Sequence, residues 1–167
     1  MTGLLEVREV AAGEEDAVGD LTVAAYTAIG ELALSGGYAD ELRDVKRRAG
    51  GAVVLVGLLD GRLVGGVTYV PDASSPWAED LRDGEAGIRM LAVRPEAQGA
   101  GVGRALTHEC IDRAVAGGRA AVFLHSTPWM TAAHSIYTQL GFTRVPERDW
   151  LPVPEVPLWA FRLGLAQ

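Results

Sequence analysis

The sequence predicts a single domain of the mixed α/β (α+β) class, spanning residues 1–167. Short β runs alternate with amphipathic helical stretches, which indicates a sheet with crossover helices. Two β runs flank an Asp-Gly pair, which favours hairpins in the same sheet. No internal repeat, charge block or linker marks a second domain, and the 49% hydrophobic and 22% charged composition is globular.

The first half is expected to form a strand, two helices and a hairpin. Apolar residues alternate with charged ones in the strand and recur every three or four positions in the helices. Asp60-Gly61 is the strongest hairpin signal in the chain, and Ser35-Gly36-Gly37 and Gly50-Gly51 end the two helices. The expected ranges are 4–10 for the strand, about 13–34 and 38–49 for the helices, and 53–56 and 63–70 for the hairpin.

The second half is expected to alternate strands with helices. It begins after a loop at 71–84 and includes a Pro-rich connection at 146–157. Strands are expected at 88–93, 121–124, 142–145 and 158–163, and helices at 101–116 and 129–140. The resulting order is β-α-α-β-β-β-α-β-α-β-β.

The acidic charge balance restricts the partners. A net charge of −7 and a sequence pI near 4.9 argue against binding nucleic acid or an anionic membrane, and favour cationic partners such as amines. No signal peptide or membrane-length apolar run is visible, so we expect a cytoplasmic protein. The single cysteine, Cys110, is expected to be a buried inert thiol, and no acid or histidine spacing suggests a metal site.

A glycine-rich turn between a strand and a helix carries the clearest chemical signal. Gly99, Gly101 and Gly103 let the backbone adopt positive φ and come close to a bound group. The free N–H groups of the helix that follows would favour an anion such as a pyrophosphate, although a turn without a ligand remains the alternative. The turn lacks the Gly-Lys-Ser/Thr ending of a Walker loop and the spacing of a Rossmann fingerprint.

Two sequence blocks resemble motifs of the GCN5-related N-acetyltransferase (GNAT) superfamily. Gln98-Gly99-Ala100-Gly101-Val102-Gly103, behind Leu91-Ala92-Val93-x-Pro, is similar to Arg/Gln-x-x-Gly-x-Gly/Ala. The second block, 133–142, is similar to A-x-x-x-Y-x-x-L-G-F. The element order of the whole chain also matches. This resemblance implies a GNAT-like three-layer fold and an N-acetyltransferase that moves an acetyl group from acetyl-coenzyme A directly to a primary amine in a ternary complex.

The resemblance also implies roles for particular residues. Main-chain groups of Leu91 and Val93 would pair with the pantetheine arm of acetyl-CoA. Tyr137 matches the tyrosine that protonates the departing thiolate, although a packing role for its ring is the alternative. The backbone amides expected at the pyrophosphate are those of Gln98, Gly99, Ala100, Gly101, Val102, Gly103 and Arg104.

The chain departs from the family pattern at two positions. Gly87 stands where several members have a glutamate base, and Met130 replaces an asparagine that contacts the coenzyme. If side chains alternate along the strand, Glu85, Gly87, Arg89 and Leu91 share a face. Glu85 could then act as the base through a water, or be a solvated acid. His125 is a second candidate base, and Ser126 or Thr127 could supply a compensating hydroxyl.

The acceptor amine is left open by the sequence. A peptide N-terminus, a lysine, a polyamine, an aminoglycoside or a small amine metabolite are all compatible with it, and so is a homodimer. A catalytically silent acetyl-CoA or CoA binder, acting as a sensor or interaction module, is the alternative function. Residues expected to select the acceptor, or else to be core or rim, are Tyr26, Glu31, Tyr38, Trp77, Trp129 and Trp150.

Overall fold

A computed structural model describes residues 3–30 and 37–166. Its sheet is eight-stranded, with the order β1-β2-β3-β4-β5-β8-β6 and with β7 paired to β8. The strands are β1 (Leu5–Glu9), β2 (Val53–Leu59), β3 (Arg62–Val70), β4 (Glu85–Val93), β5 (Ala121–Ser126), β6 (Thr143–Arg144), β7 (Trp150–Val153) and β8 (Val156–Gly164). The helices are α1 (Glu15–Ala28), α2 (Tyr38–Arg43), α3 (Val45–Ala49), α4 (Val102–Ala116) and α5 (Thr131–Gln139), with 3-10 turns η2 (Pro95–Ala97) and η3 (Pro146–Arg148).

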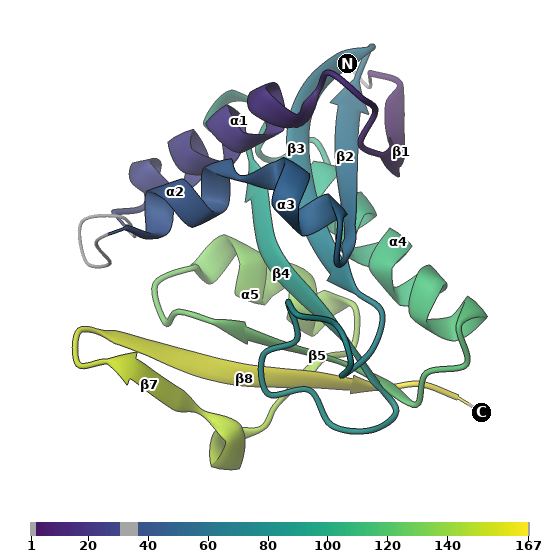
Figure 1. The fold of residues 1–167 in the computed structure, drawn as a ribbon, viewed down its shortest axis with the longest axis vertical. Helices are drawn as coiled ribbons and strands as arrows, with labels where there is room; N and C mark the ends of the chain where they lie inside the picture. The colour runs from purple at the N-terminus through teal and green to yellow at the C-terminus, as the bar shows by residue number, and fades with distance from the viewer. Residues whose placement is uncertain (1–2, 31–36, 167) are drawn as a thin grey trace.

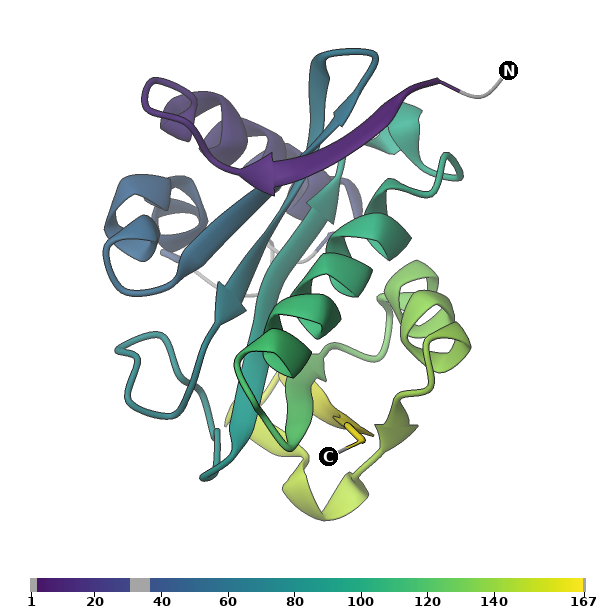
Figure 2. The same cartoon turned by 90° about the vertical axis from the view of Figure 1, so that its right-hand side faces the viewer.

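The elements form three layers, as expected. Helices α1, α2 and α3 cover one face of the sheet, and α4 and α5 cover the other (Figures 1 and 2). Each face has its own buried apolar cluster. The cluster on the α4 face includes Leu91, Leu124 and Phe161, and the cluster on the α1 face includes Leu21 and Met90. Within residues 3–30 and 37–166, no helix has the length and apolar character to cross a bilayer.

The hairpin between β2 and β3 confirms the Asp-Gly prediction. Asp60 has φ 52° and Gly61 has φ 78°, which matches a type I′ turn whose twist suits antiparallel strands. The Asp60 carboxylate also accepts a hydrogen bond of 2.8 Å from the Leu4 N–H, which ties the start of β1 to the turn.

The second predicted helix is divided in two. The single helix expected over 38–49 is wrong, because the chain breaks at Asp44, where its side chain accepts the Arg47 N–H at 3.2 Å and caps α3. The first helix ends earlier than expected, at Ala28. Ser35 and Gly36 of the predicted stop signal lie outside the described residues.

The connection predicted at 146–157 contains an additional strand. β7 pairs antiparallel with β8, with Trp150 opposite Leu158 and Val153 opposite Val156. Pro152 lacks an N–H, but β7 is an edge strand, where a missing ladder bond is tolerated. The chain therefore ends in three strands rather than two, and β7–β8 forms a hairpin.

The most consequential irregularity lies in β4. Its parallel pairing with β5 extends only from Glu85 to Gly87, and the two strands separate beyond that point. On the other side, the register with β3 shifts between Gly66 and Thr68, and Met90 adopts φ 57°. Two residues of β4 thus oppose one of β3, which is a β-bulge.

The bulge changes the alternation of side chains along β4. Met90 joins the cluster on the α1 face, whereas Leu91 joins the cluster on the α4 face. Arg89 packs on the α1 side, beside Trp77. The expectation that Glu85, Gly87, Arg89 and Leu91 share one face is therefore wrong, because the extra residue reverses the pattern at Leu91.

Candidate active site

Two cavities meet where β4 and β5 separate. The larger, of about 710 Å³, is lined by the glycine turn and by α5, and we name it the turn cavity. The smaller, of about 300 Å³, is walled by aromatic side chains on the α1 and β7–β8 side, and we name it the aromatic cavity. Tyr26 and Met130 line both. A molecule in one cavity can therefore lie next to a molecule in the other.

The floor of the turn cavity has the features of an anion site. Gly99 and Gly101 have φ of 86° and 87°, and a Cβ at either would meet no protein atom within 4 Å. The first main-chain bond of α4 runs from the Ala105 N–H to the Gly101 carbonyl at 3.0 Å. The N–H groups of residues 102–104 therefore have no acceptor within the helix, and they lie at the positive end of its dipole.

Helix α5 closes the other side of the turn cavity. A Cβ at Gly103 would lie 2.9 Å from Ile136 Cδ1, so a larger residue would require the end of the Ile136 side chain to move. Arg104 Nη1 also donates to Gln139 Oε1 at 2.8 Å, which links the two helices.

The turn cavity brings together most of the residues expected to bind the coenzyme. Ala100 is not among those that line it, and its N–H donates to the Ala97 carbonyl at 3.4 Å. The expected residues that do line the cavity are Leu91, Val93, Gln98, Gly99, Gly101, Val102, Gly103 and Arg104.

Tyr137 lies in the core and lines neither cavity. Its side chain packs against Phe142 and Phe161, with ring centroids 5.6 and 5.8 Å away, and the residue is 4% exposed. Burial raises the pKa of its hydroxyl. That hydroxyl has no hydrogen-bond partner within the described part of the chain, which is unusual for a buried tyrosine.

Glu85 is a buried ion-pair partner rather than a solvated acid. Arg148 donates to it twice, at 2.8 and 3.0 Å, and Arg162 Nε donates at 2.8 Å. Burial alone would raise the pKa of Glu85, but these arginines and the Arg82 N–H hold it below the ordinary value. Glu85 also lines neither cavity, so its placement argues against the expected role as a base.

The position of the missing family glutamate leaves little room for a longer side chain. Gly87 lines the aromatic cavity, and a Cβ there would lie 3.2 and 3.3 Å from the two Cδ atoms of Leu81. A glutamate would require Leu81 to move. If the site has a base, it comes from elsewhere in the chain.

His125 and Glu79 supply a second candidate base in the wall of the aromatic cavity. His125 Nδ1 lies 3.5 Å from Glu79 Oε1, and Nε2 lies 2.9 Å from the Arg148 carbonyl oxygen. A carbonyl only accepts hydrogen bonds, so this contact assigns the Nε2 proton and leaves Nδ1 as the exchangeable position. Burial lowers the pKa of His125, but Glu79 and the Arg148 carbonyl outweigh it and hold the pKa above its ordinary value.

A second histidine holds a hydroxyl at the end of β5. His134 Nε2 lies 3.1 Å from Ser126 Oγ, which in turn lies 3.6 Å from the Met130 sulfur. The pKa of His134 lies below its ordinary value, mainly because the side chain is partly buried. Its imidazole is therefore neutral near pH 7. Ser126 lines the aromatic cavity close to where β4 and β5 separate.

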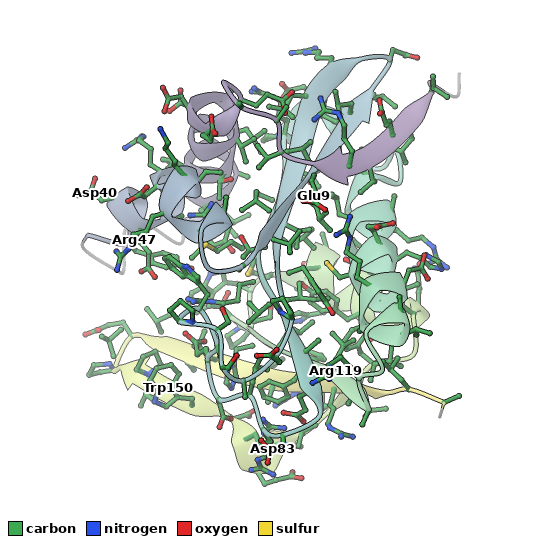
Figure 3. The ribbon with its side chains drawn as sticks, turned by 45° about the vertical axis from the view of Figure 1, so that its right-hand side comes forward. Glu9, Asp40, Arg47, Asp83, Arg119 and Trp150 are labelled. Atoms are coloured by element: carbon green, nitrogen blue, oxygen red, sulfur yellow. The ribbon has the colours of Figure 1, made fainter. Side chains whose placement is uncertain are left out.

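The remaining wall combines residues that the sequence suggested with some that it did not. Glu41, Glu79 and Arg89 line the aromatic cavity and were not predicted, although an arginine within an apolar strand was an available signal at Arg89. Trp129 lines the turn cavity, and Glu31 lies outside the described residues. The expected residues in the aromatic wall are Tyr26, Tyr38, Trp77 and Trp150, and Figure 3 shows Trp150 on the β7–β8 side.

Within residues 3–30 and 37–166, no group of three or more histidine, cysteine, aspartate or glutamate side chains is placed to hold a metal ion.

Comparison with known proteins identifies a family and a shared fold. The family model described as "Acetyltransferase (GNAT) family" matches residues 18–142. An acetyltransferase of the GNAT family from Staphylococcus aureus Mu50 superposes with a TM-score of 0.76 at 11% identity, covering 98% of this chain and all of that one. The yncA acetyltransferase from Salmonella typhimurium, solved with its cofactor acetyl-CoA, has a TM-score of 0.71 at 20% identity, covering 98% and 95% of the two chains.

A curated relative matches part of the chain. N-acetylaspartate synthetase from Danio rerio is 32% identical over 104 residues, which cover 62% of this chain. The match covers 34% of the relative, so the chain spans about a third of its length.

The ion pairs of Glu85 predict a large structural effect of its substitution. Glu85→Gln keeps the size of the side chain but removes the buried charge partner of Arg148, which keeps only the half-exposed Asp80, so the free energy of unfolding should fall by about 3 kcal/mol. Because the folded pKa is lowered, the Glu85 contribution is fully present above the unfolded pKa of about 4.3 and is lost as pH falls through the folded value. Urea unfolding at several pH values measures both effects.

Glu96→Gln is the matched control, because Glu96 forms an exposed pair with Arg62 at 3.7 Å. Its substitution should change stability little. If Glu85→Gln were no more destabilising than Glu96→Gln, the structural role assigned to the buried pair would be wrong.

Proposed function

Because the chain belongs to the acetyltransferase (GNAT) family, we propose that it transfers an acetyl group from acetyl-CoA to a primary amine. The observation that carries this proposal is the junction of the two cavities at Tyr26 and Met130. The turn cavity would hold the coenzyme and the aromatic cavity the amine, so that transfer is direct within a ternary complex. The name of the Danio rerio relative, N-acetylaspartate synthetase, supports a nitrogen acceptor.

The coenzyme would lie along two sets of main-chain groups. The N–H groups of residues 102–104, at the start of α4, suit its pyrophosphate. The side of β4 that faces β5 has no paired strand beyond Gly87, which supports pairing of the Leu91 and Val93 backbone groups with the pantetheine arm. The Val93 N–H could also polarise the thioester carbonyl.

His125 is the proposed base for the acceptor. An alkylamine arrives protonated, with a pKa of about 10, and must lose a proton before it can attack. His125 Nδ1 would accept that proton, and the neighbouring Glu79 carboxylate would stabilise the imidazolium that forms. The amine nitrogen then forms a bond to the acetyl carbon, the carbon–sulfur bond breaks, and the second proton lost by the nitrogen balances the one gained by the departing sulfur.

Tyr137 is the proposed donor to the departing sulfur. Its hydroxyl has no partner within the described part of the chain, but the ring lines neither cavity, so the side chain would have to turn toward the thioester to act. A thiol pKa of about 8.5 lies below that of the buried phenol, so complete transfer is unfavourable on its own. The proton therefore reaches sulfur only in step with cleavage of the carbon–sulfur bond. Ser126, held by His134, is the competing donor.

Acetyl-CoA is expected to raise the melting temperature, because a ligand that binds only the folded state stabilises it. In Gly101→Ala a Cβ would enter the turn cavity, and the dissociation constant for acetyl-CoA should rise about tenfold or more, as isothermal titration calorimetry would measure. Gly118→Ala is the matched control, since Gly118 also has positive φ and an open Cβ position but lies outside the cavity. Equal affinity in the two variants would refute the pyrophosphate site.

The role of His125 predicts a characteristic pH profile. Activity should fall as pH drops through the pKa of His125, which lies above the ordinary value of about 6.5. His125→Gln should lower kcat by about 10²–10⁴-fold near neutral pH and remove that acidic limb. His108→Gln, on the exposed side of α4, serves as the control and should keep both rate and profile. An unchanged acidic limb in His125→Gln would show that the base lies elsewhere.

Substitution of Tyr137 separates chemistry from packing. Tyr137→Phe removes only a hydroxyl without a protein partner, so stability should hardly change, while kcat should fall by about 10²–10⁴-fold if the hydroxyl assists sulfur departure. Steady-state kinetics with Ser126→Ala in parallel identify the donor. A kcat of Tyr137→Phe close to wild type, with a large loss in Ser126→Ala, would transfer the role to Ser126.

A further inference from the structure

When His125 is neutral, as a base must be, the ionisable side chains of the aromatic cavity leave one negative charge uncompensated. Besides its two tyrosines, the described part of its lining contains the carboxylates of Glu41 and Glu79, the guanidinium of Arg89 and the imidazole of His125. With a neutral imidazole, two negative charges face one positive charge. An occupant with a single positive charge balances the cavity, and the balance is unchanged if its proton moves to His125.

Arg89 is already engaged by the protein. Its Nη2 lies 3.4 Å from Glu79 and 3.9 Å from Glu41, and its Nη1 donates to the Trp77 carbonyl at 3.2 Å. The Arg89 side chain is 19% exposed, so these contacts occur in a partly desolvated wall. A carboxylate on an incoming molecule would have to compete with two resident carboxylates for this guanidinium, and it would be repelled by both.

The opposite wall of the aromatic cavity is apolar. It comes from the β7–β8 hairpin, where Trp150 and Val153 are 47% and 40% exposed although they are hydrophobic. Trp150 also lies close to His125, with ring centroids 6.2 Å apart. Exposed apolar side chains that line a cavity favour an apolar body on the occupant. The apolar residues contributed by the hairpin are Trp150, Pro152, Val153, Val156 and Leu158.

From this arrangement we propose that the acceptor is a small, singly charged primary amine that carries an apolar or aromatic body and no carboxylate. This inference rests on the proposed function and specifies its acceptor. The ammonium group lies between Glu79 and His125, the body packs against Trp150 and the rest of the hairpin wall, and Glu41 and Glu79 exclude carboxylates. The volume of about 300 Å³ is at the lower end for small-molecule sites and fits a compact amine.

Matched amines test each part of the proposal. 2-Phenylethylamine and phenylalanine differ only by a carboxylate, and 2-phenylethylamine and ethylamine differ only by the aromatic ring. With saturating acetyl-CoA and release of free thiol as the readout, kcat/KM should be at least about 100-fold higher for 2-phenylethylamine than for phenylalanine, because like charges brought together cost several kcal/mol. Ethylamine should be used less efficiently, mainly through a higher KM.

Two variants assign these preferences to the walls. Glu41→Gln removes one of the two charges that repel a carboxylate. The ratio of kcat/KM for 2-phenylethylamine to kcat/KM for phenylalanine should therefore fall by about tenfold. Trp150→Ala should raise the KM for 2-phenylethylamine but not for ethylamine, a difference that a general loss of stability would not produce. Arg43→Gln, which removes an exposed pair with Asp20 outside the aromatic cavity, is the control and should preserve both preferences.

The outcomes distinguish failure of this inference from failure of the proposed function. If phenylalanine, aspartate or a lysine-containing peptide were acetylated at least as efficiently as 2-phenylethylamine, the protein would be an N-acetyltransferase and the acceptor class proposed here would be wrong. If acetyl-CoA bound but no amine, amino acid or peptide lysine released thiol, the transfer reaction itself would be refuted, together with this inference. In that case a silent coenzyme binder would remain.

Discussion

The separation of β4 from β5 is the constraint on which the rest of the site depends. Parallel pairing between them stops at Gly87, and the bulge at Met90 sets the face of the sheet to which each later side chain of β4 points. Met90 therefore lines the aromatic cavity while Leu91 lines the turn cavity. A continuous ladder would satisfy the backbone groups of β4 and close the junction. The bulge requires a positive φ at Met90, which costs a non-glycine residue energy.

The aromatic cavity is held in shape from a distance. Arg148 of η3 reaches Glu85 with its side chain, contacts Asp80 and lies over the Phe123 ring, with its guanidinium carbon 3.5 Å from the ring centroid. The carbonyl of the same residue is the partner of His125 Nε2. One residue thus anchors the segment before β7 and fixes the tautomer of His125. The buried charges of Glu85 and Arg148 position groups at the cavity without lining it.

Local patterns were sufficient to predict the glycine turn and most of the element order, apart from the split between α2 and α3 and the strand β7. The Asp60-Gly61 hairpin and the helix after Gly101 follow from backbone preferences that a few residues determine. The bulge at Met90 has no such local signal, and it invalidated the alternation used to place Leu91. β7 was obscured by its proline, and the partner of Glu85 is 63 residues away in the sequence, so neither could be inferred from spacing.

The buried pair of Glu85 and Arg148 also has a consequence for how this sequence can diverge. Replacing either residue alone leaves a charge in a region that water does not reach, whereas replacing both with apolar residues of similar volume can be neutral. The effects of the two substitutions are therefore strongly non-additive. Among descendants of this protein, Glu85 and Arg148 should be retained together or lost together. A lineage that replaces only one of them must tolerate a less stable fold and a shifted Arg148 carbonyl beside His125.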